Sequence, residues 1–344
     1  MKLLNGMMLA GLCCLAFTGV AAAAEPAKAE PAKPEAFTFS GPYTYQNLTI
    51  FLVHGKDSLP GKKFLTLPEA LEQKKIVVHE TKNVNELSVE NISIDVEIFI
   101  QSGDVVKGGQ QDRVLGYDLI VPAKSGKVPI LSFCVEAGRW SQRGGESAGQ
   151  FGSSMNNASG KSLKLAVNFA RKQDEVWAKV QEAQQKLAKN VGQSVQSKDS
   201  PTSLQLTLED KKLLESLDAY VKAMVKLTDG KKDVIGYVTA VNGKIDGADI
   251  FGSPVLFTKA WPRLLKGCAV DALAEFDKDK KVTQPTVEDV KKFLTEAEQG
   301  KKETKKDVSP RCEVQTKEAE KNLLIESRDR ENKDVFLRRN YIAK

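Results

Sequence analysis

Apolar and polar residues alternate through much of the first half of the chain, with the period of a β-strand that has one buried face. Six segments show this alternation or a short apolar run, at residues 46–53, 75–80, 87–91, 94–100, 114–121 and 128–135. A short helix is predicted at residues 66–71, with Thr66 as its cap and Pro68 in its first turn. Because the connections between the strands are short, we expect them to pair antiparallel.

The second half changes to the three- and four-residue spacing of amphipathic helices. Helices are predicted at residues 162–191, 208–227 and 261–276, and a fourth from a Thr286 cap to near Gln299. Two apolar runs, 234–241 and 244–251, flank Asn242-Gly243, which is a strong signal for a two-residue hairpin. Residues 323–327 and 335–341 predict a closing hairpin.

These elements indicate an α+β protein, not a doubly wound nucleotide-binding fold. We expect an antiparallel, β-rich N-terminal half, residues 37–155, packed with a mixed helical and β-hairpin C-terminal half, residues 156–344. The length of this span suits one large domain or two modest ones, and we predict a single α+β domain over residues 37–344.

The N-terminus has the form of a cleavable secretory signal over residues 1–24. Lys2 precedes an apolar segment from about residue 3 to residue 20, and four alanines then precede Glu25. A membrane anchor is the weaker alternative, because polar and glycine residues interrupt the apolar segment. Residues 25–36 follow as a Pro/Ala/Glu/Lys linker without core-forming side chains. We expect a periplasmic or secreted protein with no transmembrane segment after cleavage of the signal.

Basic and acidic residues are well mixed along the mature chain. Without Lys2 the chain has 50 basic and 45 acidic residues, which gives a net charge of +5. No run of Lys and Arg is interleaved with aromatic residues, as a nucleic-acid groove would require. Nucleic acid is therefore not expected as a partner.

Three cysteines remain after processing, at Cys134, Cys268 and Cys312. In an oxidising compartment one disulfide and one free thiol are open to them, and the spacing does not choose among the three pairings. The apolar surroundings of Cys134 and Cys268 favour buried thiols for these two.

Signatures of metal and nucleotide chemistry are missing from the sequence. The two histidines, His54 and His79, lack metal-ligand spacing, so no metal and no cofactor are expected. The segment Gly160-Lys161-Ser162 lacks the upstream glycine of a phosphate-binding loop, because residue 155 is Met.

Polar residues gather among glycines and β-rich runs between residues 101 and 140. A guanidinium beside carboxylates can bind an anion through its planar fork, and a carboxylate held near it can act as a base. The alternative is a structural network, in which Arg113 and Arg139 brace turns by pairing with Asp112 and Glu136. The candidate residues are Asp104, Gln110, Gln111, Asp112, Arg113, Glu136, Arg139 and Trp140.

The same segments resemble the ARG and Rhodanese-Phosphatase-superfamily-associated Protein domain family. The family's hallmark is Gly-Glu, then Gly-x-x-Gln-Asn-Arg, then Cys-Val-Glu-x-Gly-Arg-Trp. Asp104 replaces the Glu of this hallmark and Asp112 replaces its Asn. Further similar segments lie at residues 64–71, 173–177, 200–202 and 236–273, so the resemblance spans most of the mature chain. It implies no established reaction. The hallmark stands here as Gly103-Asp104, Gly108-Gly109-Gln110-Gln111-Asp112-Arg113 and Cys134-Val135-Glu136-Ala137-Gly138-Arg139-Trp140.

Two classes of function follow from these residues. The favoured one is an exported soluble binding or interaction protein, whose polar cluster holds a small anionic ligand or a protein partner. The alternative is a periplasmic enzyme, hydrolytic or transferase-like, with Asp104 or Glu136 as the base and Arg113 or Arg139 binding an anion. Because the sequence has no metal-ligand signature, binding is preferred, and a purely structural role is the third interpretation.

Overall fold

The computed structural model describes residues 37–81, 83–139, 143, 150–157, 160–332 and 335–344. The predicted signal and linker, at 1–36, lie outside the described residues. Residues 36–344 form one compact unit that contains both helices and antiparallel sheets, which confirms the predicted α+β class.

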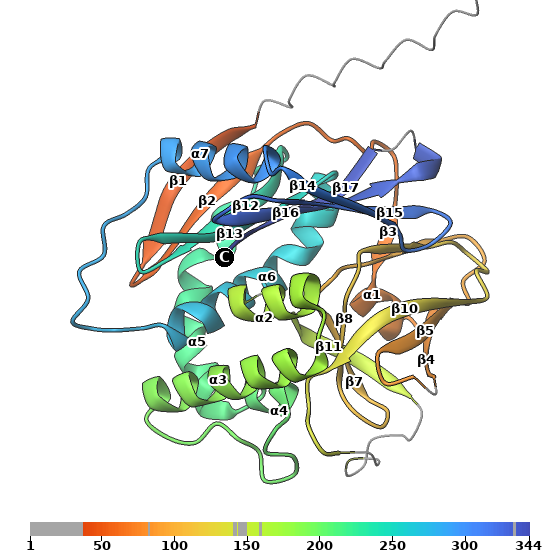
Figure 1. Ribbon diagram of the computed structural model, residues 1–344, viewed down its shortest axis with the longest axis horizontal. Coiled ribbons are helices and arrows are strands. Elements are labelled where there is room, and N and C mark those ends of the chain that lie inside the picture. Colours follow the sequence, from red (N-terminus) through yellow and green to blue (C-terminus); the bar gives the residue numbers. More distant parts are fainter. Residues whose placement is uncertain (1–36, 82, 140–142, 144–149, 158–159, 333–334) are drawn as a thin grey trace, which may run out of the picture. The chain divides into compact units, whose positions relative to one another are not determined.

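The largest sheet has eight strands, and it joins the first two strands of the described chain to six strands from its second half (Figure 1). Neighbouring strands pair antiparallel, and β2 pairs directly with β12. The N-terminal strands therefore complete a sheet of the C-terminal half. The strand order is β1 (Thr38–Tyr45), β2 (Leu48–His54), β12 (Val234–Val241), β13 (Lys244–Phe251), β17 (Val335–Ala343), β16 (Asn322–Asp329), β15 (Cys312–Glu318) and β14 (Lys302–Asp307).

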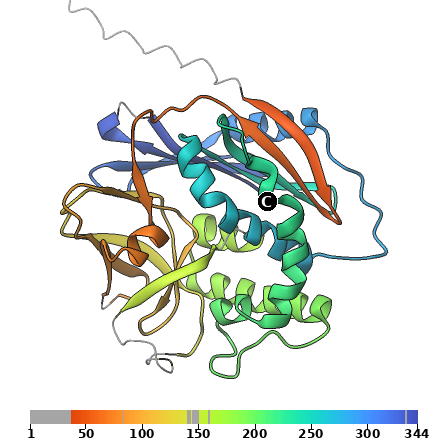
Figure 2. The same ribbon diagram turned by 180° about the vertical axis from the view of Figure 1, so that it is seen from behind.

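Helices cover both faces of this sheet. Along β2, Leu48 and Ile50 belong to the large core shared with α5 (Lys211–Met224) and α6 (Pro254–Ala274). Phe51 and Val53 face the other way, into a smaller core shared with α7 (Val287–Glu298). A strand buried on both faces has a nearly continuous apolar sequence, as β2 does. Figure 2, the reverse view, shows α6 between the eight-stranded sheet and β11 (Phe151–Asn157), both of which it contacts.

Two smaller sheets carry the hallmark segments and their surroundings. The six-stranded sheet has the order β11, β7 (Asp104–Gly108), β8 (Arg113–Leu115), β10 (Lys127–Cys134), β5 (Glu86–Asn91) and β4 (Ile76–Glu80). The three-stranded sheet has the order β3 (Phe64–Thr66), β6 (Glu97–Ile100) and β9 (Leu119–Val121). Of the described strand pairs, β3 with β6 is parallel, and the others are antiparallel as predicted.

Several local predictions are confirmed. α1 (Leu67–Glu72) begins at the Thr66 cap, and Thr286 caps α7 through a capping box. Asn242 and Gly243 take positive φ values of 52° and 77° in the β12–β13 hairpin, as its two-residue turn requires. Strands β16 and β17 form the predicted closing hairpin.

Residues 114–121, predicted as one strand, form two strands in different sheets. β8 ends at Leu115 and β9 begins at Leu119. Between them Asp118 accepts the backbone N–H of Ser102 at 2.7 Å and a guanidinium N–H of Arg338 at 3.0 Å. The chain turns there because a buried carboxylate takes partners from distant segments, which local periodicity does not reveal.

Residues 162–191, predicted as one helix, are also divided. α2 (Lys161–Leu165) leads into a π-helical turn (Ala166–Ala170), and α3 (Gln173–Val191) follows. The N–H of Arg171 donates to the carbonyl of Ala166 at 2.8 Å, and Arg171 itself takes the left-handed conformation, with φ 54°. This conformation ends the first helix, because a residue with positive φ cannot continue a right-handed one.

Other helix boundaries differ from the prediction because of their caps. α5 begins at Lys211, after an Asp210 cap, and passes into a 3₁₀ turn (Val225–Thr228). α6 begins at Pro254 after a Ser253 cap, seven residues before the predicted start at residue 261. A short α4 (Leu204–Leu208) and a 3₁₀ turn (Arg330–Asn332) complete the helical segments that the structure describes.

Cys134, Cys268 and Cys312 are buried thiols with no disulfide within the described ranges. Burial raises the pKa of Cys268 to about 12 and the pKa of Cys312 to about 11, so both thiols stay protonated. None of the helices in the described part of the chain is long and apolar enough to span a bilayer.

Candidate functional site

The hallmark segments meet at neighbouring strands of the six-stranded sheet. β7 and β8 pair antiparallel, and Cys134 at the end of β10 pairs with Arg113 at the start of β8. The turn between β7 and β8 needs its glycines. A Cβ on Gly109 would lie 2.4 Å from the Phe151 ring, and a Cβ on Gly108 would lie 2.7 Å from a backbone carbonyl oxygen. This tight turn directs Asp112 into the protein interior.

Asp112 and Glu136 are fully buried between two arginines. Arg143 donates to both carboxylate oxygens of Asp112, at 2.9 and 3.1 Å, and lies 3.4 Å from Glu136. Arg139 lies 2.8 Å from Glu136 and 3.8 Å from Asp112. Two carboxylates thus face two guanidinium groups. Arg143 was not identified from the sequence, because it lies outside the hallmark segments.

Further hydrogen bonds use the remaining acceptor capacity of the two carboxylates. Asp112 accepts the N–H of Gly108 at 3.0 Å and the hydroxyl of Ser203 at 3.0 Å. Glu136 accepts the N–H of Asp112 at 3.2 Å. Burial would raise the pKa of Glu136, but hydrogen bonding to Arg139 outweighs it, so this pKa lies below its usual value. A lowered pKa makes this carboxylate a weaker general base at neutral pH.

Gln111 and Arg113 extend this network behind the turn. Gln111 donates its side-chain N–H to the carbonyl of Glu136 at 3.0 Å and accepts a guanidinium N–H of Arg113 at 3.0 Å. Arg113 is 1% exposed, and it also donates to the Cys134 sulfur and lies 3.6 Å from a carboxylate oxygen of Glu80. Trp140, the last residue of the hallmark, lies outside the described residues.

Asp104 belongs to a different network. Its carboxylate accepts a guanidinium N–H of Arg263 in α6 at 2.7 Å and the side-chain N–H of Asn157 at 3.0 Å. Its other oxygen accepts the N–H of Gln101 at 3.0 Å. Asp104 and Asp112 thus brace separate contacts, one between β7 and α6 and the other around the β7–β8 turn. The arrangement of both networks fits the structural interpretation of the hallmark residues.

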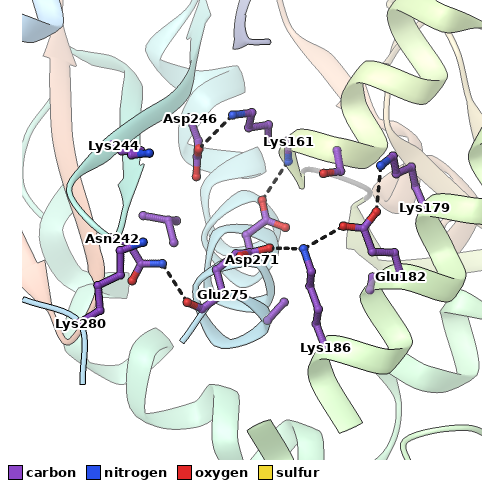
Figure 3. A pocket seen from close by; sticks show the side chains of 14 residues that line it. Lys161, Lys179, Glu182, Lys186, Asn242, Lys244, Asp246, Asp271, Glu275 and Lys280 are labelled. Atoms are coloured by element: carbon purple, nitrogen blue, oxygen red, sulfur yellow. Dashed lines mark hydrogen bonds and ion pairs between the residues drawn. The ribbon is translucent and has the colours of Figure 1, made fainter. Parts of the chain in front are cut away.

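A cleft of about 320 Å³ lies on another part of the protein, where α2 and α3 face the β12–β13 turn and the end of α6 (Figure 3). Five lysines and four acidic residues line it. The charged residues are Lys161, Lys179, Lys186, Lys244, Lys280, Glu182, Asp246, Asp271 and Glu275.

The α3 wall of the cleft carries a chain of ion pairs. Glu182 lies 2.8 Å from Lys179 and 2.8 Å from Lys186, and Lys186 also lies 2.6 Å from Glu275 at the end of α6. These lysines lower the pKa of Glu182 to about 2. The carboxylates of Glu182 and Glu275 are therefore neutralised by the ammonium groups of Lys179 and Lys186.

The floor of the cleft holds two carboxylates beside Lys161. The ammonium of Lys161 lies 3.7 Å from Asp246, and its backbone N–H donates to Asp271 at 2.9 Å. Burial raises the pKa of Asp246 to about 6, although Lys161 opposes this shift. Burial and the nearby charge of Asp246 raise the pKa of Asp271 to about 7. At neutral pH the pair therefore carries less than its full negative charge.

The opposite wall carries two lysines that are not in ion pairs with other described residues. Lys244 and Lys280 have no hydrogen-bond or ion-pair partner for their ammonium groups within the part of the chain that the structure describes. Both are exposed and border the cleft across from Lys179 and Lys186 (Figure 3). The cleft thus offers uncompensated positive charge beside neutralised carboxylates. The sequence does not reveal this cleft, because its residues come from separate elements between positions 161 and 280.

In the described ranges, no group of three or more His, Cys, Asp or Glu side chains is arranged to hold a metal ion. No curated protein and no solved structure matches this chain. The model of the ARG and Rhodanese-Phosphatase-superfamily-associated Protein domain matches residues 36–335, which is nearly the whole chain. The chain therefore belongs to the ARG and Rhodanese-Phosphatase-superfamily-associated Protein domain family.

Proposed function

We propose that this protein is an exported binding protein that takes a small anionic ligand in the lysine-lined cleft. The observation that carries the proposal is the pair of unpartnered ammonium groups, Lys244 and Lys280, in a cleft whose carboxylates are neutralised or partly protonated. This proposal moves the predicted binding site away from the hallmark residues, because arginines hold the carboxylates of Asp104, Asp112 and Glu136.

The size and charge of the cleft support a small ligand. A volume of about 320 Å³ is at the lower end of the range for small-molecule sites. An anion between the two walls would gain two ammonium partners from Lys244 and Lys280 without breaking an existing ion pair. Lysine ammonium groups act as mobile point charges, and they suit phosphate or carboxylate groups of varied geometry.

Binding is tested with inorganic phosphate and citrate as probes in low-salt buffer, where screening is weak. We expect saturable binding by calorimetry and a rise in unfolding free energy of about 2.7 kcal/mol at 100 times the dissociation constant. The double variant Lys244→Gln/Lys280→Gln should bind at least about tenfold more weakly. A control of equal charge change, Lys198→Gln/Lys232→Gln, alters two exposed lysines outside the cleft and should bind like the parent. Equal affinities in the two double variants, or no saturable binding of either probe, would refute the proposal.

Export has its own test, which does not depend on the ligand. Mass spectrometry of protein from the periplasmic fraction should show an N-terminus at or near Glu25, where the predicted signal ends. A chain that keeps residues 1–24 in the membrane fraction would contradict export in cleaved form.

A second candidate function is supported by the two carboxylates on the cleft floor. With pKa values of about 6 and 7, Asp246 and Asp271 could divide the roles of base and acid near neutral pH. Asp104 and Glu136, the predicted bases, are instead held by Arg263 and Arg139. Hydrolysis of nitrophenyl esters and phosphates tests this enzyme hypothesis. It requires a bell-shaped pH profile and loss of activity in Asp271→Asn, and undetectable turnover would count against it.

A further inference from the structure

A second cavity lies between the β8–β9 connection, the π-helical turn and strands β16 and β17. It shares no lining residue with the lysine-lined cleft. Its lining includes buried polar residues from four separate parts of the chain. The polar lining residues are Ser102, Tyr117, Asp118, Asn168, Arg171, Arg338 and Asn340.

The cavity is small and narrow. The space open to the centre of a water molecule is about 10 Å³, which is enough for about one water molecule or one functional group of that size. Of its lining residues, Arg171 and Ile325 are partly exposed and the others are buried. Arg171 and Ile325, the two lining residues that reach solvent, therefore mark the mouth of the cavity.

Two lining residues have buried polar atoms without a partner. The hydroxyl of Tyr117 and the side-chain carbonyl of Asn340 make no hydrogen bond within the described structure. The Asn340 amide is held in place, because its N–H donates to Asp249 and its carbonyl oxygen must then point away from that carboxylate. A guest must donate a hydrogen bond to Asn340 and can accept one from Tyr117. A hydroxyl group does both, whereas a carboxylate oxygen only accepts.

The charges beneath the cavity are balanced. Arg338 donates to Asp249 and to Asp118, and Lys164 donates to Asp249 at 2.8 Å. Two cationic groups thus face two carboxylates. These cations hold the pKa of Asp249 well below its usual value, although burial acts in the opposite direction. This buried network contributes no net charge to the cavity.

Arg171 at the mouth supplies the remaining charge. Its guanidinium lies 5.0 Å from the centre of the Tyr117 ring, and its Nε donates to the carbonyl of Asn168 at 3.0 Å. Its two terminal nitrogens have no hydrogen-bond partner among the described residues. Lys306 places an ammonium 5.2 Å from the same ring centre. An acidic group at the mouth could therefore accept hydrogen bonds from the terminal nitrogens of Arg171.

The local backbone around Arg171 is unusual. A π-helical turn and a non-glycine residue at positive φ each carry a conformational cost, and both occur in consecutive residues here. Such costs are found preferentially at functional sites. This backbone agrees with a binding role for the cavity, which rests on the unpartnered polar atoms and the free guanidinium nitrogens.

We propose that the cavity seats the hydroxyl group of a small hydroxylated anion, with the acidic group of the ligand on Arg171. The ligand class is a short hydroxy acid or an equivalent hydroxylated acid. This site is independent of the lysine-lined cleft, and its test uses the Lys244→Gln/Lys280→Gln background, so that binding in the cleft does not contribute.

The test compares glycolate with acetate, which differ by one hydroxyl group, with calorimetry and ligand-observed NMR as readouts. Glycolate should bind saturably and at least about tenfold more tightly than acetate, because only its hydroxyl can satisfy Asn340 and Tyr117. Tyr117→Phe should reduce this preference severalfold. The control Tyr43→Phe changes a tyrosine outside the cavity and should keep the preference.

Arg171 is tested with Arg171→Gln, which should weaken binding of both acids about tenfold or more. A circular dichroism spectrum and a thermal melt establish that this variant is folded. Equal affinity for glycolate and acetate would show that the cavity holds a solvent molecule only and would overturn the proposal. Absence of binding by either acid, or unchanged affinity in folded Arg171→Gln, would overturn it as well.

Discussion

The buried network around the β7–β8 hallmark turn makes a sharp prediction for Asp112→Asn. This substitution keeps the shape of the side chain and creates no cavity, but it removes the negative charge. Asp112 accepts two hydrogen bonds from Arg143 and one each from Gly108 and Ser203. In the variant, one amide N–H₂ group must face these donors, and the charge of Arg143 depends on Glu136, 3.4 Å away.

The expected loss follows from the burial of both partners. Asp112 is fully buried and the side chain of Arg143 is 6% exposed, so water cannot replace the lost carboxylate. Breaking a buried pair of this kind costs about 3–5 kcal/mol of unfolding free energy. The control Glu209→Gln removes one partner of the Lys107–Glu209 pair, whose side chains are 26% and 40% exposed. This exposed pair should lose under about 1 kcal/mol.

The assay is urea unfolding followed by tryptophan fluorescence and by circular dichroism. Coincident transitions and an unchanged dependence on urea allow the midpoints to be converted into free energies. If Asp112→Asn loses no more than Glu209→Gln, the network does not brace the fold. The hallmark residues would then be free to serve a ligand, as the sequence first suggested.

Two further predictions concern titration and helix capping. Asp271 has a pKa of about 7 in the folded protein, above its unfolded value of about 3.9, so it destabilises the fold increasingly as pH rises from 4 to 7. The stability of Asp271→Asn relative to the parent should therefore rise as pH increases through this window, and the gain should reach about 1–2 kcal/mol at pH 8 after screening by solvent. The control Asp279→Asn changes an exposed carboxylate. If Asp271→Asn shows the same pH-independent difference as this control, the pKa assignment is contradicted. Thr286 accepts the N–H of Asp289 at 3.2 Å, so Thr286→Ala should lower stability by about 1 kcal/mol. Thr295→Ala, at an exposed position within α7, should not lower stability in the same urea assay, because Ala has a higher helix propensity than Thr.

Local signals in the sequence predicted many elements correctly. Asn242-Gly243 predicted its hairpin, because the positive φ values of this turn suit these two residues. Thr66 and Thr286 predicted the starts of α1 and α7, because a cap is satisfied by residues three positions away. The family was also recognisable from short segments, since the Cys-Val-Glu-x-Gly-Arg-Trp stretch is specific.

Predictions failed where distant partners decide the local structure. Asp118 ends a strand because Ser102 and Arg338 bind its carboxylate, and neither is near it in sequence. The break at Arg171 was missed for another reason: an apolar helical period continues across it, and only the left-handed backbone of Arg171 reveals it. At the hallmark, the sequence placed the right residue types together but did not determine whether their charges were free or paired. Arg143 settles this for Asp112, whose carboxylate stands where the family hallmark has Asn.

The sequence by itself determined the α+β class, the family, and the elements that are fixed by turns, caps and periodicity. These depend on contacts within a few residues, which a single sequence displays directly. Only the tertiary structure decided which strands share a sheet and which charges are compensated. Lys244 and Lys280 matter because of the residues on the opposite wall of the cleft. Tyr117 and Asn340 matter because they line a cavity that six separate parts of the chain enclose. Compensation of charge depends on distances in space, and a linear pattern of residue types does not contain them.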